Sequence, residues 1–303
     1  MVEFDAGDIE PLVVVNALPC ADSTLLVNIT YSRFFLDNKE FKPVEGASVE
    51  IETGGTTLVP THRTGANYMF NYRIAGGDSL TMHVNIDGYD EIYSATRVPY
   101  NPPIDSLKFE IDTLTPFTSG EISFTLNDDA SLRNYYLIYI MERDSGSRWN
   151  SWETRWDTID TVVHATFNCM DLSICDQSVN LSTGLLGYFG SLLFTDSLIN
   201  GQNHSVLITI PMFKDTAEHP IQRDYTLVVE SLSHEAFRYR AAVSKASSLT
   251  QYFAEPEKIY SNINGALGIM AGISKRTIPI TFTYKEAVQD STARRRHFFQ
   301  KRM

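Results

Sequence analysis

Apolar residues alternate with polar ones through much of the first hundred residues of the chain. In the clearest case Leu80, Met82 and Val84 alternate with polar neighbours, and a repeat of two places these side chains on one face of a half-buried strand. The same alternation recurs in other segments: Val27, Ile29 and Tyr31; Ala47, Val49 and Ile51; Leu107, Phe109 and Ile111. Glycine-containing pairs at 54–55, 76–77 and 87–88 can close hairpins between the strands. About seven short strands at this spacing predict an immunoglobulin-like or transthyretin-like β-sandwich over residues 1–98.

A proline-rich segment ends this pattern. Three of the chain's 12 prolines, Pro99, Pro102 and Pro103, fall close together, and proline interrupts both strand ladders and helices. We therefore predict a linker at residues 99–104. Because proline-rich linkers are stiff, we expect the two flanking domains to keep a limited range of relative orientations.

Residues 105–290 are predicted to form a second, β-rich domain. Alternation predicts strands near 122–126, 206–210, 225–229 and 278–284, and the unbroken apolar run at 135–141 is typical of a strand covered on both faces. A helix is predicted near 233–247, since Ser233 is a suitable N-cap and the residues behind it are rich in alanine. The predicted fold class is thus mainly β: an N-terminal sandwich, then a β-rich domain with one docked α-helix.

Charge is unevenly distributed along the chain. The 25 lysines and arginines against 37 acidic residues give a net charge of −12, which disfavours nucleic acid as a partner because phosphate binding needs clustered cations. Residues 291–303 form a basic tail with five cations, Arg294, Arg295, Arg296, Lys301 and Arg302, and no acid. This tail either contacts an anionic surface or is a solvated chain end.

Targeting and membrane signals are sparse. No apolar run approaches the ~18 residues of a membrane-spanning helix. The first residues have neither the basic nor the apolar region of a signal peptide, which indicates a cytoplasmic protein or a mature chain whose targeting segment has been removed.

Cysteine is rare, at Cys20, Cys169 and Cys175. An odd count excludes complete pairing within the chain. Cys169 and Cys175 are close enough in sequence to form a disulfide in an oxidising compartment, and two free thiols remain the alternative. Too few further ligands lie nearby for a zinc site, and we expect neither a metal nor another cofactor.

All three tryptophans occur in one polar segment. Trp149, Trp152 and Trp156 alternate there with Arg148 and Arg155. Exposed tryptophan and arginine side chains are typical anchors of interfaces and would suit a sugar, a peptide or a partner protein. Alternatively, the rings close the end of a sandwich or cover its edge, since tryptophan readily becomes buried.

Other motifs give no catalytic residue. His234-Glu235 lacks the second histidine of a zinc-protease helix, because Arg238 stands four residues on. The glycines of 184–191 accompany neither a serine elbow nor a phosphate-binding lysine. Acidic residues at 87, 90, 128 and 129 are interpreted as turn residues rather than as calcium ligands.

Several segments together resemble one family. They are residues 12–18, 43–49, 134–136, 194–202, 231–235, 254–256 and, most specifically, 261–265. In this respect the chain resembles a Bacteroidota lipoprotein family known only as a domain of unknown function, whose members occur beside TonB-dependent outer-membrane receptors. The resemblance implies an outer-membrane, surface-exposed location through a lipid anchor lost from this chain, and a receptor of that kind as partner.

The most family-like run, 260–273, has a modest physical interpretation. Asn264-Gly265 is a turn signal, and Gly268 and Gly272 permit a strand with close backbone approach. We expect this strand to help assemble the sheet of the second domain.

Two main functional hypotheses follow. The first is a non-enzymatic accessory or ligand-binding subunit of a TonB-dependent transporter, taking a small molecule, peptide or glycan. The second is an extracellular hydrolase of peptide or glycan, whose site residues are distant in sequence. A structural or adhesive surface protein is a third alternative, and it would need open strand edges.

Overall fold

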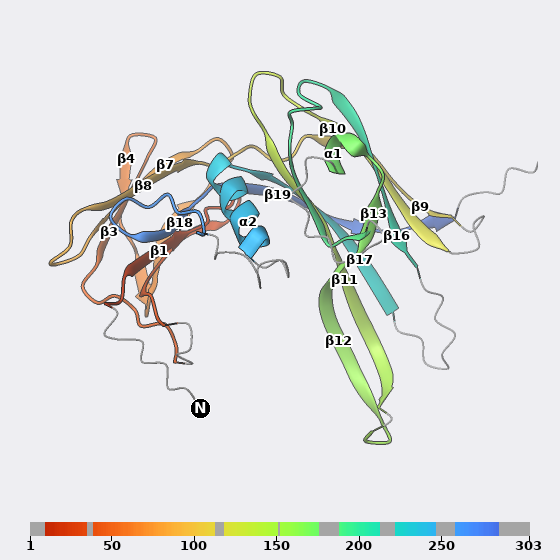
Figure 1. Ribbon diagram of the computed structural model, residues 1–303, viewed down its shortest axis with the longest axis horizontal. Helices are drawn as coiled ribbons and strands as arrows, with labels where there is room; N and C mark the ends of the chain where they lie inside the picture. The colour runs from red at the N-terminus through yellow and green to blue at the C-terminus, as the bar shows by residue number, and fades with distance from the viewer. Residues whose placement is uncertain are drawn as a thin grey trace, which may run out of the picture.

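The protein consists of two β-sandwich lobes joined side by side (Figure 1). The structure is a computed structural model that describes residues 10–34, 39–112, 118–150, 152–175, 188–212, 222–246 and 258–284. Four sheets stack in pairs, and each pair encloses one apolar core. The prediction of a mainly β protein is confirmed. The predicted basic tail, residues 291–303, lies outside the described residues.

The first lobe is built from two sheets with strand orders β18-β1-β2-β6-β5 and β4-β3-β7-β8. Its strands are β1 (Val13–Ala17), β2 (Thr24–Tyr31), β3 (Ser48–Thr53), β4 (Thr56–Leu58), β5 (His62–Thr64), β6 (Asn67–Arg73), β7 (Ser79–Asn85), β8 (Ile92–Arg97) and β18 (Leu267–Met270). The alternation seen in the sequence explains the core, because Leu80, Met82 and Val84 of β7 are all buried. Each such side chain contributes about 1.5–3 kcal/mol relative to an exposed position.

The second lobe has a six-stranded sheet, β14-β13-β16-β10-β9-β20, facing a sheet of order β12-β11-β17-β19, with β15 also paired to β11. Its strands are β9 (Ile104–Asp112), β10 (Ser119–Asn127), β11 (Tyr135–Asn150), β12 (Arg155–Ala165), β13 (Phe167–Cys169), β14 (Tyr188–Phe189), β15 (Ser191–Thr195), β16 (Asn203–Pro211), β17 (Gln222–Leu232), β19 (Ile273–Ile280) and β20 (Thr283–Tyr284). Residues 135–138 of β11 are all buried, so the strand covered on both faces is confirmed. A one-turn helix, α1 (Leu172–Cys175), was not predicted.

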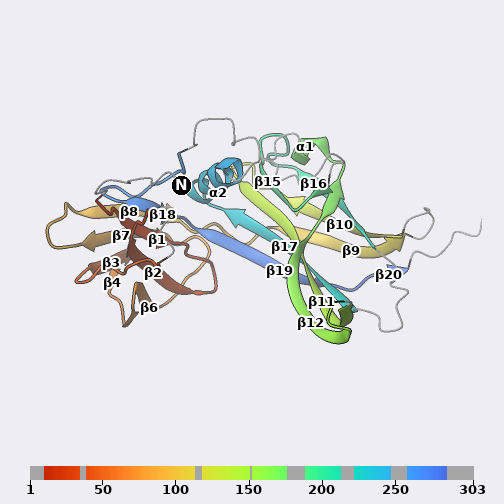
Figure 2. The ribbon, with the colours of Figure 1, turned by 60° about the horizontal axis from the view of Figure 1, so that its bottom comes forward.

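The predicted helix is α2 (His234–Ala246), and it lies beside the junction of the lobes (Figures 1 and 2). Ser233 caps it as expected, since its Oγ accepts a hydrogen bond from the Ala236 N–H at 3.2 Å. Ala236 is buried, and Phe237 packs against an apolar cluster that also contains Ile269 and Ala271. The helix therefore covers the seam between the lobes.

The C-terminal part of the chain returns to the first lobe, contrary to our expectation. β18 pairs in parallel with β1, with Leu267 opposite Val14 and Met270 opposite Ala17. The chain then passes through Ala271 and Gly272 directly into β19 of the second lobe. The assignment of all of 105–290 to the second domain was thus wrong for this strand, because its partner strand lies about 250 residues away in sequence and no local pattern specifies such pairing.

The proline-rich segment runs beside β19 at the junction. The Ser274 hydroxyl donates to the Pro99 carbonyl at 2.6 Å, and the Arg276 guanidinium donates to the Ile104 carbonyl at 2.5 Å. Residue 104 already begins β9. In the described ranges the chain therefore crosses between the lobes at 98–104 and again at 271–272. Among the described residues, no helix has the length and apolar character needed to cross a membrane.

Candidate functional site

The tryptophan segment forms the tip of a long β-hairpin made by β11 and β12 (Figure 1). The pairing of β11 with β17 ends at Ser145, opposite Gln222. Beyond that point β11 pairs only with β12 among the described residues, up to Asn150 opposite Arg155. The tip thus extends past the sheet that supports its base, and Figure 2 shows the same projection from another side.

The tip presents aromatic surface to solvent. Trp152 is 96% exposed and Trp156 is 47% exposed. The exposure of Trp152 contradicts the alternative that this ring closes the end of a sandwich or covers its edge, whereas Trp156 is half-covered. Trp149 lies opposite Trp156 in the register, but the side chains of Trp149 and Arg148 lie outside the described part of the chain.

Polar contacts within the tip hold its shape. The side-chain oxygen of Asn150 accepts hydrogen bonds from the Trp152 and Glu153 N–H groups, and its nitrogen donates to Asp157 at 2.8 Å. Arg155 lies between two carboxylates, 2.7 Å from Glu153 and 2.8 Å from Asp157. Hydrogen bonds from Asn150 and Arg155 lower the pKa of Asp157, which keeps this carboxylate charged. The turn therefore positions Trp152 rather than leaving it on a loose loop.

One edge of the hairpin is unpaired within the described part of the chain. β12 pairs with β11 alone among the described residues, and Val162 and Val163 are 54% and 50% exposed. An exposed edge strand has unpaired N–H and C=O groups that can receive another strand. The hairpin thus combines aromatic anchors with an open edge.

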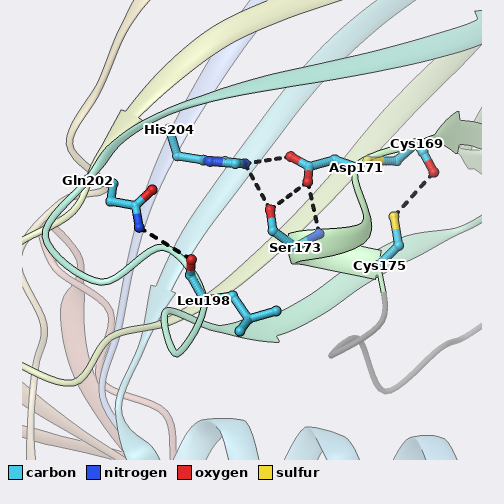
Figure 3. A network of polar contacts seen from close by, with 7 residues as sticks. All are labelled: Cys169, Asp171, Ser173, Cys175, Leu198, Gln202 and His204. Carbon is cyan, nitrogen blue, oxygen red and sulfur yellow. Dashed lines mark hydrogen bonds and ion pairs between the residues drawn. The ribbon is translucent and has the colours of Figure 1, made fainter.

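A second polar cluster links α1 to β16 (Figure 3). His204 Nε2 lies 2.5 Å from Asp171 Oδ2 and 3.2 Å from Ser173 Oγ, and Ser173 Oγ lies 2.5 Å from Asp171 Oδ1. A Ser-His-Asp triad uses both ring nitrogens, one for the serine and one for the aspartate. Here both contacts fall on Nε2 and the serine hydroxyl donates to the aspartate, so the geometry is not that of a triad.

This cluster instead explains why α1 exists. Asp171 accepts a hydrogen bond from the Ser173 N–H at 3.0 Å, as an N-capping residue does. Burial alone would raise the pKa of Asp171, but hydrogen bonds from Ser173 and His204 together lower it. The carboxylate therefore stays ionised and holds the short helix against β16.

The two neighbouring cysteines are free thiols in this structure. The Cys175 Sγ donates to the Cys169 carbonyl at 3.2 Å, and Figure 3 shows both side chains beside Asp171. A hydrogen bond from Cys175 lowers the pKa of Cys169, although burial opposes this. Their proximity agrees with the short spacing, while pairing as a disulfide stays a prediction.

A pocket of about 540 Å³ lies between the lobes, which we call the junction pocket. Three segments line it: residues 97–103 at the end of the first lobe, 127–136 around the β10–β11 connection, and 231–235 where β17 meets α2. Its size is within the range of small-molecule sites, which often form between domains. No sequence pattern pointed to this site, because its three segments are far apart along the chain.

Hydrogen bonds to Asp128 hold two residues that line the junction pocket, Asn134 and Tyr136. Asp128, which we interpreted as a turn residue, is instead buried and accepts hydrogen bonds from the Tyr136 hydroxyl at 2.8 Å, from Asn134 and from the Gly201 N–H. Burial, followed by the bond to Asp128, raises the pKa of Tyr136 far above its usual value, so that the hydroxyl remains a donor. Asp129 is a turn residue as expected, since it accepts two hydrogen bonds from Ser131.

His234 and Glu235 have roles other than metal binding. The His234 ring lies 5.6 Å from the Tyr135 ring, and Glu235 accepts a hydrogen bond from the Thr96 hydroxyl at 3.3 Å. Within the described segments no group of three or more His, Cys, Asp or Glu side chains could hold a metal ion.

The fold and these surfaces define a two-lobed β-sandwich protein with a projecting aromatic hairpin and a pocket between its lobes. The chain belongs to the family described as domain of unknown function (DUF4249), whose model matches residues 1–278. This confirms the resemblance at the level of that family. No curated protein matches the chain.

Eighteen chains of solved structures match in the structural comparison. One is the chitinase ChiA74 from Bacillus thuringiensis, which is 11% identical, with a TM-score of 0.20. The match covers 72% of this chain and spans only 30% of that one. A likeness this weak carries no argument about fold or activity.

Proposed function

We propose that this protein is a non-enzymatic binding protein of the cell envelope that docks on a TonB-dependent outer-membrane receptor through its tryptophan hairpin. The observation that carries the proposal is the exposure of Trp152 and Trp156 at a structured tip. The solvated Trp152 indole gains little stability for a monomer, whereas tryptophan is among the residues most enriched at the centres of interfaces. The choice of a TonB-dependent receptor as the partner rests on the family resemblance.

Charge and shape support a protein partner. Arg155 directly precedes Trp156 in the sequence and forms ion pairs with Glu153 and Asp157, and arginine accompanies tryptophan at energetically dominant interface positions. The hairpin also projects from the body of the molecule (Figure 1), so a partner can contact both of its faces. A concave small-molecule site would require enclosing walls, which the described tip does not have.

The test is the double variant Trp152→Ala/Trp156→Ala, purified by an affinity tag from native membranes. We expect the natural protein to recover a β-barrel receptor and the variant to lose it, with an affinity at least about 30-fold weaker. The midpoint of thermal unfolding should stay nearly unchanged, because neither ring is in a core. Tyr93→Ala is the matched control, since Tyr93 is 48% exposed on the first lobe. Recovery of the receptor by the double variant, or of no receptor by the natural protein, would contradict the proposal.

The open edge of β12 favours a second candidate, assembly into a surface structure by strand pairing. In that case Val162→Lys/Val163→Lys, which places two charges on exposed positions of the edge strand, should abolish self-association in analytical ultracentrifugation. Concentration-independent monomers of the natural protein would exclude this candidate without affecting the first.

A further inference from the structure

We infer that the junction pocket binds a small zwitterion with a ring or aliphatic body, of the kind represented by a free amino acid or a short peptide. This site is separate from the hairpin, so it does not depend on the function proposed above. The inference rests on the charged groups, the two tyrosine rings and the volume of this pocket.

The pocket displays unpaired charges of both signs. Arg97 and Arg133 line it, and neither forms an ion pair with a carboxylate among the described residues. Asp129 and Glu235 line it as well. Their charges sum to zero, and these guanidinium and carboxylate groups share one pocket without neutralising one another. A ligand that carries one charge of each sign complements such a lining.

The two arginines suit a carboxylate in particular. A guanidinium group binds a carboxylate through two parallel N–H···O bonds, which adds geometric selection to the charge. Arg133 is also placed over the Tyr135 ring, with its central carbon 5.9 Å from the ring centroid. Arg97 comes from the first lobe and Arg133 from the second, so the carboxylate end of the ligand would contact both lobes.

Asp129 offers an acceptor for the ammonium end. Its Oδ1 accepts both hydrogen bonds from Ser131, at 2.9 Å and 2.7 Å, and these contacts fix the carboxylate. They also lower its pKa, so it is charged at neutral pH. The second oxygen, Oδ2, has no hydrogen bond among the described residues. Glu235 is a second acceptor on the opposite segment of the lining.

Two tyrosine side chains of the lining provide a surface for the uncharged part of the ligand. The Tyr100 side chain lines the pocket, and its hydroxyl would lie 2.6 Å from a Cβ atom at Gly77, so the ring rests directly on the backbone of that turn. Tyr135 also lines the pocket and packs near His234 and Phe237, with ring centroids 5.6 and 4.9 Å away. Two held tyrosine rings give a flat, partly apolar surface on which a ring or aliphatic group can pack.

The experiment is isothermal titration with four probes: L-phenylalanine, phenylalaninamide, which lacks the carboxylate, N-acetylphenylalanine, which lacks the ammonium, and the dipeptide Phe-Phe. We expect phenylalanine to bind at least about tenfold more tightly than either single-charge analogue, since each lost charge removes charge-assisted hydrogen bonds. Tighter binding of Phe-Phe than of phenylalanine would identify short peptides as the class of natural ligand, and the reverse would identify free amino acids.

Variants assign each charge to its partner. Arg97→Gln/Arg133→Gln should erase the preference for phenylalanine over its amide, whereas Asp129→Asn should erase the preference over the N-acetyl form. Arg73→Gln is the control, because Arg73 is exposed and pairs with Asp22 in the first lobe. Equal binding of all probes, absence of binding at millimolar concentrations, or selectivity unchanged in both pocket variants would overturn the inference, while receptor recovery through the hairpin would be unaffected.

Discussion

The parallel pairing of β18 with β1 depends on Gly268. Its φ of +120° lies in a region that is unfavourable for residues with a side chain, and a Cβ atom there would overlap the Val15 carbonyl oxygen. Gly268→Ala must therefore adopt a strained backbone, at about 1–3 kcal/mol, and must also push the two strands apart. The register spans only four residue pairs, and each ladder hydrogen bond is worth about 0.5–1.5 kcal/mol.

Together these effects predict a loss of about 3–6 kcal/mol from the free energy of unfolding of the first lobe. Gly88→Ala is the matched control, since Gly88 also has a positive φ, of +84°, but a Cβ atom added there would have no neighbouring atom within 4 Å; we expect it to cost only about 1–2 kcal/mol. All three tryptophans lie in the second lobe, so tryptophan fluorescence would not report on the first lobe. Unfolding in urea should therefore be monitored by circular dichroism, together with hydrogen exchange of the β1 amides. Equal unfolding midpoints for the two variants would refute the role of the close strand contact.

Two further predictions concern stability. Ser233→Ala removes the N-cap of α2 and should lower the free energy of unfolding by about 1 kcal/mol, with Ser233→Thr close to the natural protein; no change in thermal unfolding would contradict this. Burial, followed by the charge of Glu142, raises the pKa of Tyr225 to about 12. The folded state then holds its proton more tightly than the unfolded state, so stability is complete below pH ~10 and falls by about 2 kcal/mol as the pH rises to ~12. Tyr225→Phe should flatten this fall in urea titrations, and an unchanged slope would contradict the assignment.

Local signals were sufficient for much of the fold. The alternation along β7 and the capping serine of α2 act within a few residues, and both are confirmed in the structure. The close approach expected at Gly268 and Gly272 is confirmed too, because a Cβ atom at Gly272 would overlap the Arg97 carbonyl oxygen. Our expectation that this strand joins the sheet of the second domain was wrong. β18 completes the sheet of the first lobe, and only a contact between distant segments determines that pairing.

The candidate sites also differ in how much local sequence reveals about them. The tryptophan cluster is visible in the sequence, but whether its rings are buried depends on how far β11 and β12 extend beyond β17, which residue types alone do not determine. The junction pocket is invisible in the sequence because Arg97 and Arg133 come from different lobes. Each is an ordinary exposed arginine when considered alone, and only their shared pocket makes them informative.

The contacts that fix the pocket are also those that join the lobes. The Thr96 hydroxyl, at the end of β8, accepts from the Gly272 N–H at 3.0 Å and lies within hydrogen-bond distance of Ser233 and Glu235 at the start of α2. The Ser233 N–H in turn donates to the Gly272 carbonyl at 2.9 Å. A ligand held between Arg97 of one lobe and Asp129 of the other would stabilise this same arrangement. Occupation of the pocket must therefore raise the stability of the joined lobes, by an amount that grows with ligand concentration relative to its dissociation constant.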